Sequence, residues 1–107
     1  MITSEKGEDL MVVGACKITI HLPENGSLKG KRQIVKSVLA RVRNEFNVAV
    51  AEVGSQDLWQ TADLGIVAVS NSHAHVDEML AKAVNFVERL RLDFEMGDYE
   101  TEISDLL

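Results

Sequence analysis

The strongest constraint on the fold is the order in which two hydrophobic periodicities follow one another along the chain. Apolar residues alternate with a period of two in residues 12–22, VVGACKITIHL, which predicts a strand with one buried face. Residues 28–46 repeat apolar side chains every three or four positions, which predicts an amphipathic helix with Ser27 as its N-cap. Residues 48–53 and 59–70 are then predicted to form two further strands.

The second half of the chain completes a known order of elements. Ser72 is predicted to cap a second helix, and residues 94–103 to form a last strand with a bulge near Gly97. The order β-α-β-β-α-β, with short connections and right-handed crossovers, predicts a ferredoxin-like α/β (α+β) fold. We expect a four-stranded antiparallel sheet in the order 4-1-3-2, with both helices on one face.

Length and composition fit one domain with a single core. Of the 107 residues, 1–10 are polar and are expected to form a disordered tail, with the domain spanning 11–107. The single cysteine, Cys16, excludes an intrachain disulfide and falls on the apolar face of the first strand, as a buried thiol would. No apolar run approaches the roughly 20 residues that cross a bilayer. We therefore expect a cytoplasmic protein without membrane association.

The distribution of charge is the main indication of a partner. Residues 27–45 hold six of the eleven basic residues against one acidic residue, Glu45, so this segment carries +5 in a chain of net charge −6. On a helical wheel, four of these cations fall within about 60° of each other beside the apolar face, and we call them the cationic stripe. The stripe consists of Lys29, Arg32, Lys36 and Arg43. Because several cations on one rigid surface suit phosphate binding, all six basic residues are predicted to bind RNA: Lys29, Lys31, Arg32, Lys36, Arg41 and Arg43.

Other interpretations of these cations stay open. They could form a solvated face that balances the acidic background, above all residues 93–105, which contain no basic residue. The basic helix and this acidic strand could also meet between protomers, as in a homodimer or another protein-interaction module that uses sheet edges. A small-ligand regulatory domain is a third interpretation, since dimers of this fold can form pockets at their interface.

Any RNA is expected to be recognised by its shape and its phosphates. The third strand, TADLGIVAVS, has no aromatic residue and lacks the K/R-G-F/Y-G/A-F-V-x-F/Y signature of domains that stack bases on a sheet. The sheet face is thus a poor platform for bases. This favours structured RNA over single strands.

A polar hairpin loop is the second candidate site. Residues 51–60, AEVGSQDLWQ, combine several polar side chains with a tryptophan, as recognition loops often do. A structural interpretation is favoured, however: Asp57 would cap the turn, Trp59 would cover the sheet end, and Glu52 would be a charge on an edge strand. The candidate recognition residues are Glu52, Gln56, Asp57, Trp59 and Gln60.

No catalytic pattern is strong enough to predict an enzyme. An acylphosphatase would share this topology, but the loop HLPENGSLKGKR lacks its glycine-framed phosphate cradle, and Arg32 falls inside the helix. His73 and His75 are two residues apart and face different directions on a helix, so a zinc site is not expected. We predict a non-enzymatic domain with no cofactor and no metal.

Three motifs together resemble the YlxP-like family of small uncharacterised bacterial proteins. They are SLKxKR at 27–32, RxRNxFNV at 41–48 and AEVxxQDxWQ at 51–60, and the likeness covers about residues 11–103. The resemblance implies a ferredoxin-like fold and no established enzymatic activity. It also implies a ribosomal RNA or ribosomal particle as target, since members look like neighbours of translation and ribosome-maturation genes. The ten-residue leader and the longer acidic C-terminal end depart from the family pattern.

Overall fold

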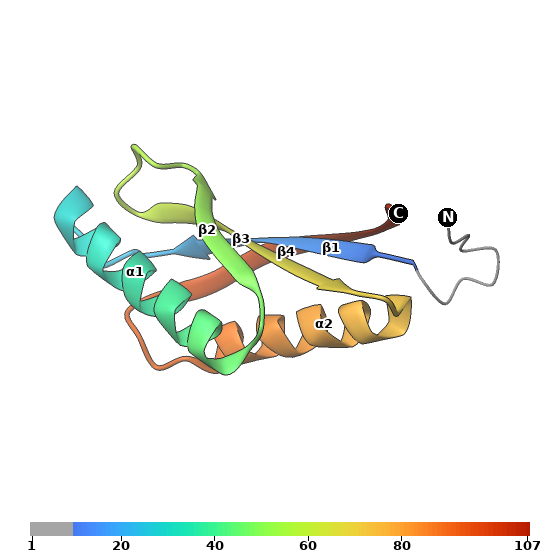
Figure 1. Ribbon diagram of the computed structural model, residues 1–107. Coiled ribbons are helices and arrows are strands. Elements are labelled where there is room, and N and C mark those ends of the chain that lie inside the picture. Colours follow the sequence, from blue (N-terminus) through green and yellow to red (C-terminus); the bar gives the residue numbers. More distant parts are fainter. Residues whose placement is uncertain (1–9) are drawn as a thin grey trace.

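The computed structural model describes residues 10–107, and its elements follow the predicted order (Figure 1). Each boundary that was predicted lies within two residues of its prediction, and the second helix begins directly after its predicted cap, Ser72. Of the predicted tail, residues 1–9 lie outside the described residues, whereas Leu10 packs against the core. The elements are β1 (Val12–His21), α1 (Leu28–Glu45), β2 (Ala49–Gly54), β3 (Thr61–Ser70), α2 (His73–Arg89) and β4 (Glu95–Asp105).

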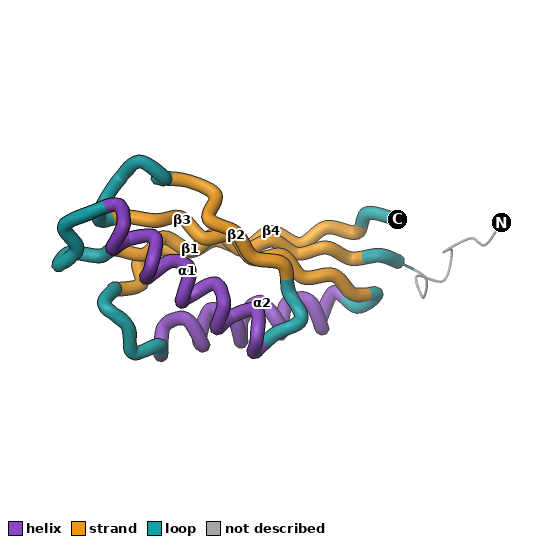
Figure 2. The backbone as a smooth tube through the Cα atoms, turned by 60° about the vertical axis from the view of Figure 1, so that its left-hand side comes forward, coloured by secondary structure: helices purple, strands orange, loops and turns teal. Residues whose placement is uncertain are grey.

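The strands form one antiparallel sheet in the order β2-β3-β1-β4, which confirms the predicted order 4-1-3-2. The predicted bulge is present, because the register of β1 against β4 shifts between Ile18 and Ile20, opposite Gly97. Both helices cover the same face of the sheet (Figure 2). The chain therefore has the ferredoxin-like α+β fold.

The core lies between the helices and the sheet. The alternating face of β1 is buried, as its period of two predicts, and it meets apolar side chains of β3, α1 and α2. Gly14 on this face allows a close approach of α2, since a Cβ there would lie 2.4 Å from Val76 Cγ1 and 2.8 Å from Leu80 Cδ1. Phe46, the residue after α1, meets Phe86 of α2 edge to face, with ring centroids 5.5 Å apart.

The two helices cover different parts of the sheet. α1 packs on β2 and on α2, whereas α2 packs on β1, β3 and β4. The basic helix therefore lies over the β2 edge, and the acidic β4 forms the other edge. In the part of the chain that the structure describes, no helix is long and apolar enough to span a membrane.

Candidate functional site

The cationic stripe lies on the solvent-facing side of α1. All four of its side chains are exposed, while Val35, Val38 and Val42 of the same helix are buried. The three ion pairs within residues 10–107 involve Lys17, Lys31 and Lys82, so none engages the stripe. The stripe extends about 21 Å along the helix axis, which is long enough to meet several backbone phosphates.

The start of α1 is capped as predicted. Ser27 Oγ accepts a hydrogen bond from the Gly30 amide at 3.0 Å, and the first turn contains no acidic residue. Asn25 lies against this turn, because a Cβ on Gly30 would approach Asn25 Oδ1 to 2.3 Å. A glycine at position 30 thus lets the Asn25 amide sit beside the helix start.

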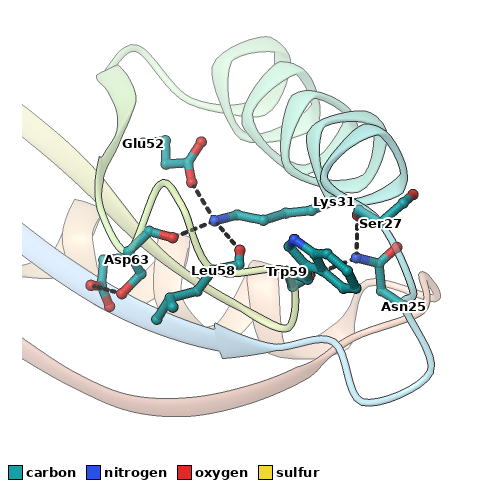
Figure 3. Close-up of polar contacts among 8 residues, drawn as sticks. Asn25, Ser27, Lys31, Glu52, Leu58, Trp59 and Asp63 are labelled. Carbon is teal, nitrogen blue, oxygen red and sulfur yellow. Dashed lines mark hydrogen bonds and ion pairs between the residues drawn. The ribbon is translucent and has the colours of Figure 1, made fainter.

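The prediction that Lys31 binds RNA is wrong, because its side chain is buried. Lys31 is 1% exposed and points inward with the apolar residues of α1. Its ammonium reaches the hairpin loop between β2 and β3, as Figure 3 shows. A buried lysine cannot contact a phosphate on the surface, so Lys31 instead connects the helix to the loop.

Three oxygens surround the Lys31 ammonium. Nζ donates to the carbonyl oxygens of Ser55 and Leu58, the second at 2.8 Å, and lies 3.0 Å from Glu52 Oε2 (Figure 3). The Glu52 contact lacks hydrogen-bond geometry and is an ion pair held by charge. Burying an ammonium is costly unless it is paired and hydrogen-bonded, and these three groups meet that requirement. Glu52 therefore faces inward beneath α1 and has a structural role.

Arg41 stands apart from the stripe. It is exposed, and its Nε donates to Ser37 Oγ at 3.3 Å within the same helix. On the wheel it lies more than about 100° from Lys29. The structure thus brings four of the six predicted RNA-binding residues onto one face and separates Lys31 and Arg41 from them.

Two amides bind the hairpin loop to the turn before α1. Asn25 Nδ2 donates to the Trp59 carbonyl at 2.6 Å and to the Ser27 carbonyl at 2.7 Å (Figure 3). Gln60 Nε2 donates to the carbonyls of Pro23 and Asn25 at 3.1 and 3.0 Å. These bonds satisfy backbone groups of both segments and fix the loop relative to the helix start.

The opposite end of the loop is fixed to the sheet. Ser55 adopts a left-handed conformation with φ of 59°, and its hydroxyl donates to Asp63 Oδ2 at 2.9 Å. Thr19 donates to the other carboxylate oxygen at 2.7 Å. The Thr19 hydrogen bond, helped by that of Ser55 and by the charges of Lys17 and Lys31, holds the pKa of Asp63 below its usual 3.8 against a weaker effect of burial.

These bonds hold a loop whose apolar tip faces solvent. Leu58 and Trp59 are 55% and 54% exposed, so Trp59 does not cover the sheet end as expected. Both lie at an open hollow of about 570 Å³ that Asn25, Gly26, Gln60 and Thr61 complete. Of the other predicted loop residues, Gln56 and Asp57 are exposed, whereas Gln60 has the structural contacts described above. Asn25, Leu58 and Asp63 also hold the loop, although no local sequence pattern predicts these contacts.

Other chemistry-bearing residues are dispersed or buried. Within residues 10–107, no three His, Cys, Asp or Glu side chains lie close enough together to hold a metal ion. Cys16 is buried as predicted, and burial raises the pKa of its thiol despite a hydrogen bond with Thr101. A raised pKa disfavours the reactive thiolate.

The segment that contains the stripe and the hairpin loop matches a known protein family. Residues 13–101 match the family described as "Protein of unknown function (DUF503)". The chain belongs to this family. Its similarity to the "Uncharacterized protein YlxP" of Bacillus subtilis (strain 168) agrees with the predicted resemblance: 38% identity over 77 residues, covering 72% of this chain and 84% of the relative. Both the α1 motif and the hairpin motif fall inside the DUF503 match.

A solved structure with little sequence likeness shares the fold. "De novo designed protein Foldit4" aligns with a TM-score of 0.50 and 14% identity, covering 91% of this chain and 99% of its own. At this identity the likeness concerns the fold alone.

Proposed function

We propose that this domain binds structured RNA, bare or within a ribosomal particle, through the cationic stripe and without catalysing a reaction. The observation that carries the proposal is the exposure of four cations on one helix face, none of them in an ion pair with residues 10–107. Free cations on a rigid surface gain affinity for phosphates by releasing counterions. Likeness to the YlxP-like family supplies the ribosomal context.

The arrangement of the sheet favours RNA over an internal role for the stripe. If the cations of α1 served to balance the acidic β4, the two elements would lie together. Instead, α1 packs over β2, and β4 is the opposite edge strand. The only cation paired with β4 among the described residues is Lys17, which lies 3.8 Å from Glu100.

Co-sedimentation with ribosomal subunits tests the proposal. We expect the protein to sediment with the particles at low salt and to be released as salt rises, because each phosphate contact adds to the salt dependence. Treating the particles with nuclease should release it as well. If no salt-dependent binding to particles or to purified ribosomal RNA is found, the proposal fails.

Self-association is the second candidate function, and a specific observation favours it. The stripe and the acidic β4 are both exposed on opposite edges of one molecule, so the stripe of one copy could meet β4 of another. Sedimentation velocity over a range of concentrations, at low and high salt, distinguishes this arrangement from RNA binding. A monomer at every concentration would exclude it.

A further inference from the structure

The hairpin loop between β2 and β3, residues 55–60, which we call the clamped loop, has hydrogen-bonded polar groups but exposed apolar side chains. Its backbone carbonyls and the side chains of Ser55 and Gln60 are used internally, since they bond to Lys31, Asn25 and neighbouring segments, whereas Gln56 and Asp57 face solvent. Its large apolar groups, Leu58 and Trp59, are instead left half exposed. The hydrogen bonds that order this part of the loop use the backbone carbonyls of Leu58 and Trp59, and they do not require the two side chains to face water. A rigid exposed aromatic therefore indicates a surface kept ready for a ligand.

We propose that Trp59 stacks an unpaired nucleobase of the RNA that the cationic stripe binds. This inference rests on the proposed function and gives a specific ligand to Trp59, which the sequence indicated only as a candidate recognition residue. Every base has a π-face, so stacking on tryptophan supplies affinity that hardly depends on sequence. The two central strands of the sheet, β1 and β3, contain no aromatic residue, so we place the base contact at the loop.

The helix that carries the cationic stripe begins at the turn to which the loop is bonded, which suits a polyanionic ligand that reaches both. The loop meets the start of α1 through Asn25 and Lys31, and the first cation of the stripe, Lys29, is in the first turn of that helix. No acidic residue stands in that turn. The acidic residues Glu24 and Asp57 are the sequence neighbours of Asn25 and Leu58, so a phosphate backbone is expected to keep to the side of Lys29.

The size of the site favours one base over a protein surface. The hollow at Leu58 and Trp59 is open to solvent and is lined by only six residues, so it offers one small contact surface. A stable protein interface needs about 800 Å² from each partner, with a continuous apolar centre. Here the two apolar side chains are bordered by the polar residues Asn25, Gln60 and Thr61.

The geometry of α1 also specifies the form of the RNA. Lys31, which reaches the loop, leaves the helix about 100° away from Arg32 of the stripe. A rigid duplex lying on the stripe therefore does not cover Trp59, whereas a single-stranded end can turn around the helix start. Both hydrogens of the Gln60 amide are engaged by Pro23 and Asn25, so a base can meet only its Oε1 acceptor. Every base has a donor for this acceptor, and adenine is the best probe because its larger ring can cover more of the indole than a uracil ring.

The single tryptophan makes the test direct, since all indole fluorescence of this chain comes from Trp59. The probes are a blunt RNA duplex, the same duplex with a short adenosine tail, and the same duplex with an abasic tail. Affinity is measured by the anisotropy of labelled RNA, and stacking by quenching of Trp59 emission. We expect the adenosine tail alone to tighten binding about tenfold and to quench the emission, since stacking one base contributes about 1–3 kcal/mol.

Three variants complete the experiment. Trp59→Ala should lose the tenfold gain from the tail but keep duplex binding, and Trp59→Phe should retain most of the gain. Tyr99→Ala is the matched control, because Tyr99 is an aromatic residue of the same 54% exposure on β4. The Tyr99→Ala variant should bind all three RNA probes as the wild type does.

The outcomes distinguish base stacking on Trp59 from RNA binding by the cationic stripe. Duplex binding without a tail effect, or a tail effect that survives in Trp59→Ala, overturns the role of Trp59 and leaves the proposed function intact. Absence of all RNA binding overturns both. A shift of Trp59 emission with protein concentration alone would assign the loop to contact with a second copy, which also overturns the inference.

Discussion

Lys31 shows that a residue's chemical type does not decide its role. Six basic residues in one helix appear alike in a count of charge, yet one of them is buried at the centre of an ion pair and two backbone contacts. Its position in the sequence indicates this burial, because residues 31, 35, 38 and 42 are spaced as the buried face of a helix is. Glu52 likewise shares the inward face of its strand with Val50. Combining the two patterns would have predicted the pair.

Replacing Lys31 should therefore affect stability far more than replacing an exposed neighbour. Lys31→Met leaves Glu52 without its partner and two carbonyls without a donor, which we expect to lower the free energy of unfolding by about 3 kcal/mol. Lys29→Met removes the same charge from an exposed position and should change it by less than about 0.5 kcal/mol. Urea denaturation followed by circular dichroism measures both. Equal stabilities would contradict the structural role of Lys31.

The lowered pKa of the Asp63 carboxyl makes the stability of the fold depend on pH. Because folding lowers the pKa of its carboxyl below 3.8, the charged form stabilises the folded protein above that pH. This contribution is lost as pH falls through the lowered pKa of the folded state. We expect the melting temperature of Asp63→Asn to lie below that of the wild type at pH 7, and the gap to narrow below pH 3.8.

Thr19→Val tests the cause of this effect, since the Thr19 hydrogen bond is the main reason for the lowered pKa. The variant should show part of the same loss at pH 7 and the same convergence in acid. A gap that stays constant down to low pH, in either variant, would show that the Asp63 carboxylate does not act in this way.

At the scale of elements, periodicity predicted the fold, and side-chain reach determined the site. The predicted bounds lie within two residues of the observed ones. The reason is that apolar residues repeat along β1 and α1 with the period at which the side chains of a strand or a helix face the core. The loop contacts are different in kind. Asn25 and Trp59 are 34 residues apart, and their bond depends on how the turn before α1 meets the hairpin. No local sequence pattern indicates a contact between segments so far apart, so the hydrogen bonds that hold the loop could not be predicted.

The packing of α2 on β1 gives a prediction for this scale. Gly14→Ala places a Cβ 2.4 Å from Val76 Cγ1, so the side chains of α2 or the helix itself must shift, and we expect a loss of about 1–3 kcal/mol in the free energy of unfolding. Gly26→Ala is the matched control, because a Cβ there meets nothing within 4 Å. Thermal denaturation of the two variants compares them directly. A Gly14→Ala protein as stable as Gly26→Ala would contradict the close approach.

At the scale of the whole molecule, the fold separates charge. The described part of the molecule is elongated, 55 × 24 × 21 Å, with the cationic α1 over one edge of the sheet and the acidic β4 at the other. A protein with net charge −6 would be repelled by RNA if its charge were spread evenly. Segregated charge instead orients the molecule, so that an approaching polyanion meets the stripe first.

The most direct test of the central claim compares two variants of equal charge. The stripe variant carries glutamine at Lys29, Arg32, Lys36 and Arg43, and the control variant carries it at Lys17, Lys82, Arg89 and Arg91, all of which are also exposed. Affinity for structured ribosomal RNA is measured for both over a range of salt concentrations. The stripe variant should bind weakly and lose about one unit of log–log salt slope for each phosphate contact removed, while the control variant follows the wild type. Equal losses in both variants would show that net charge, and not the stripe on α1, determines binding.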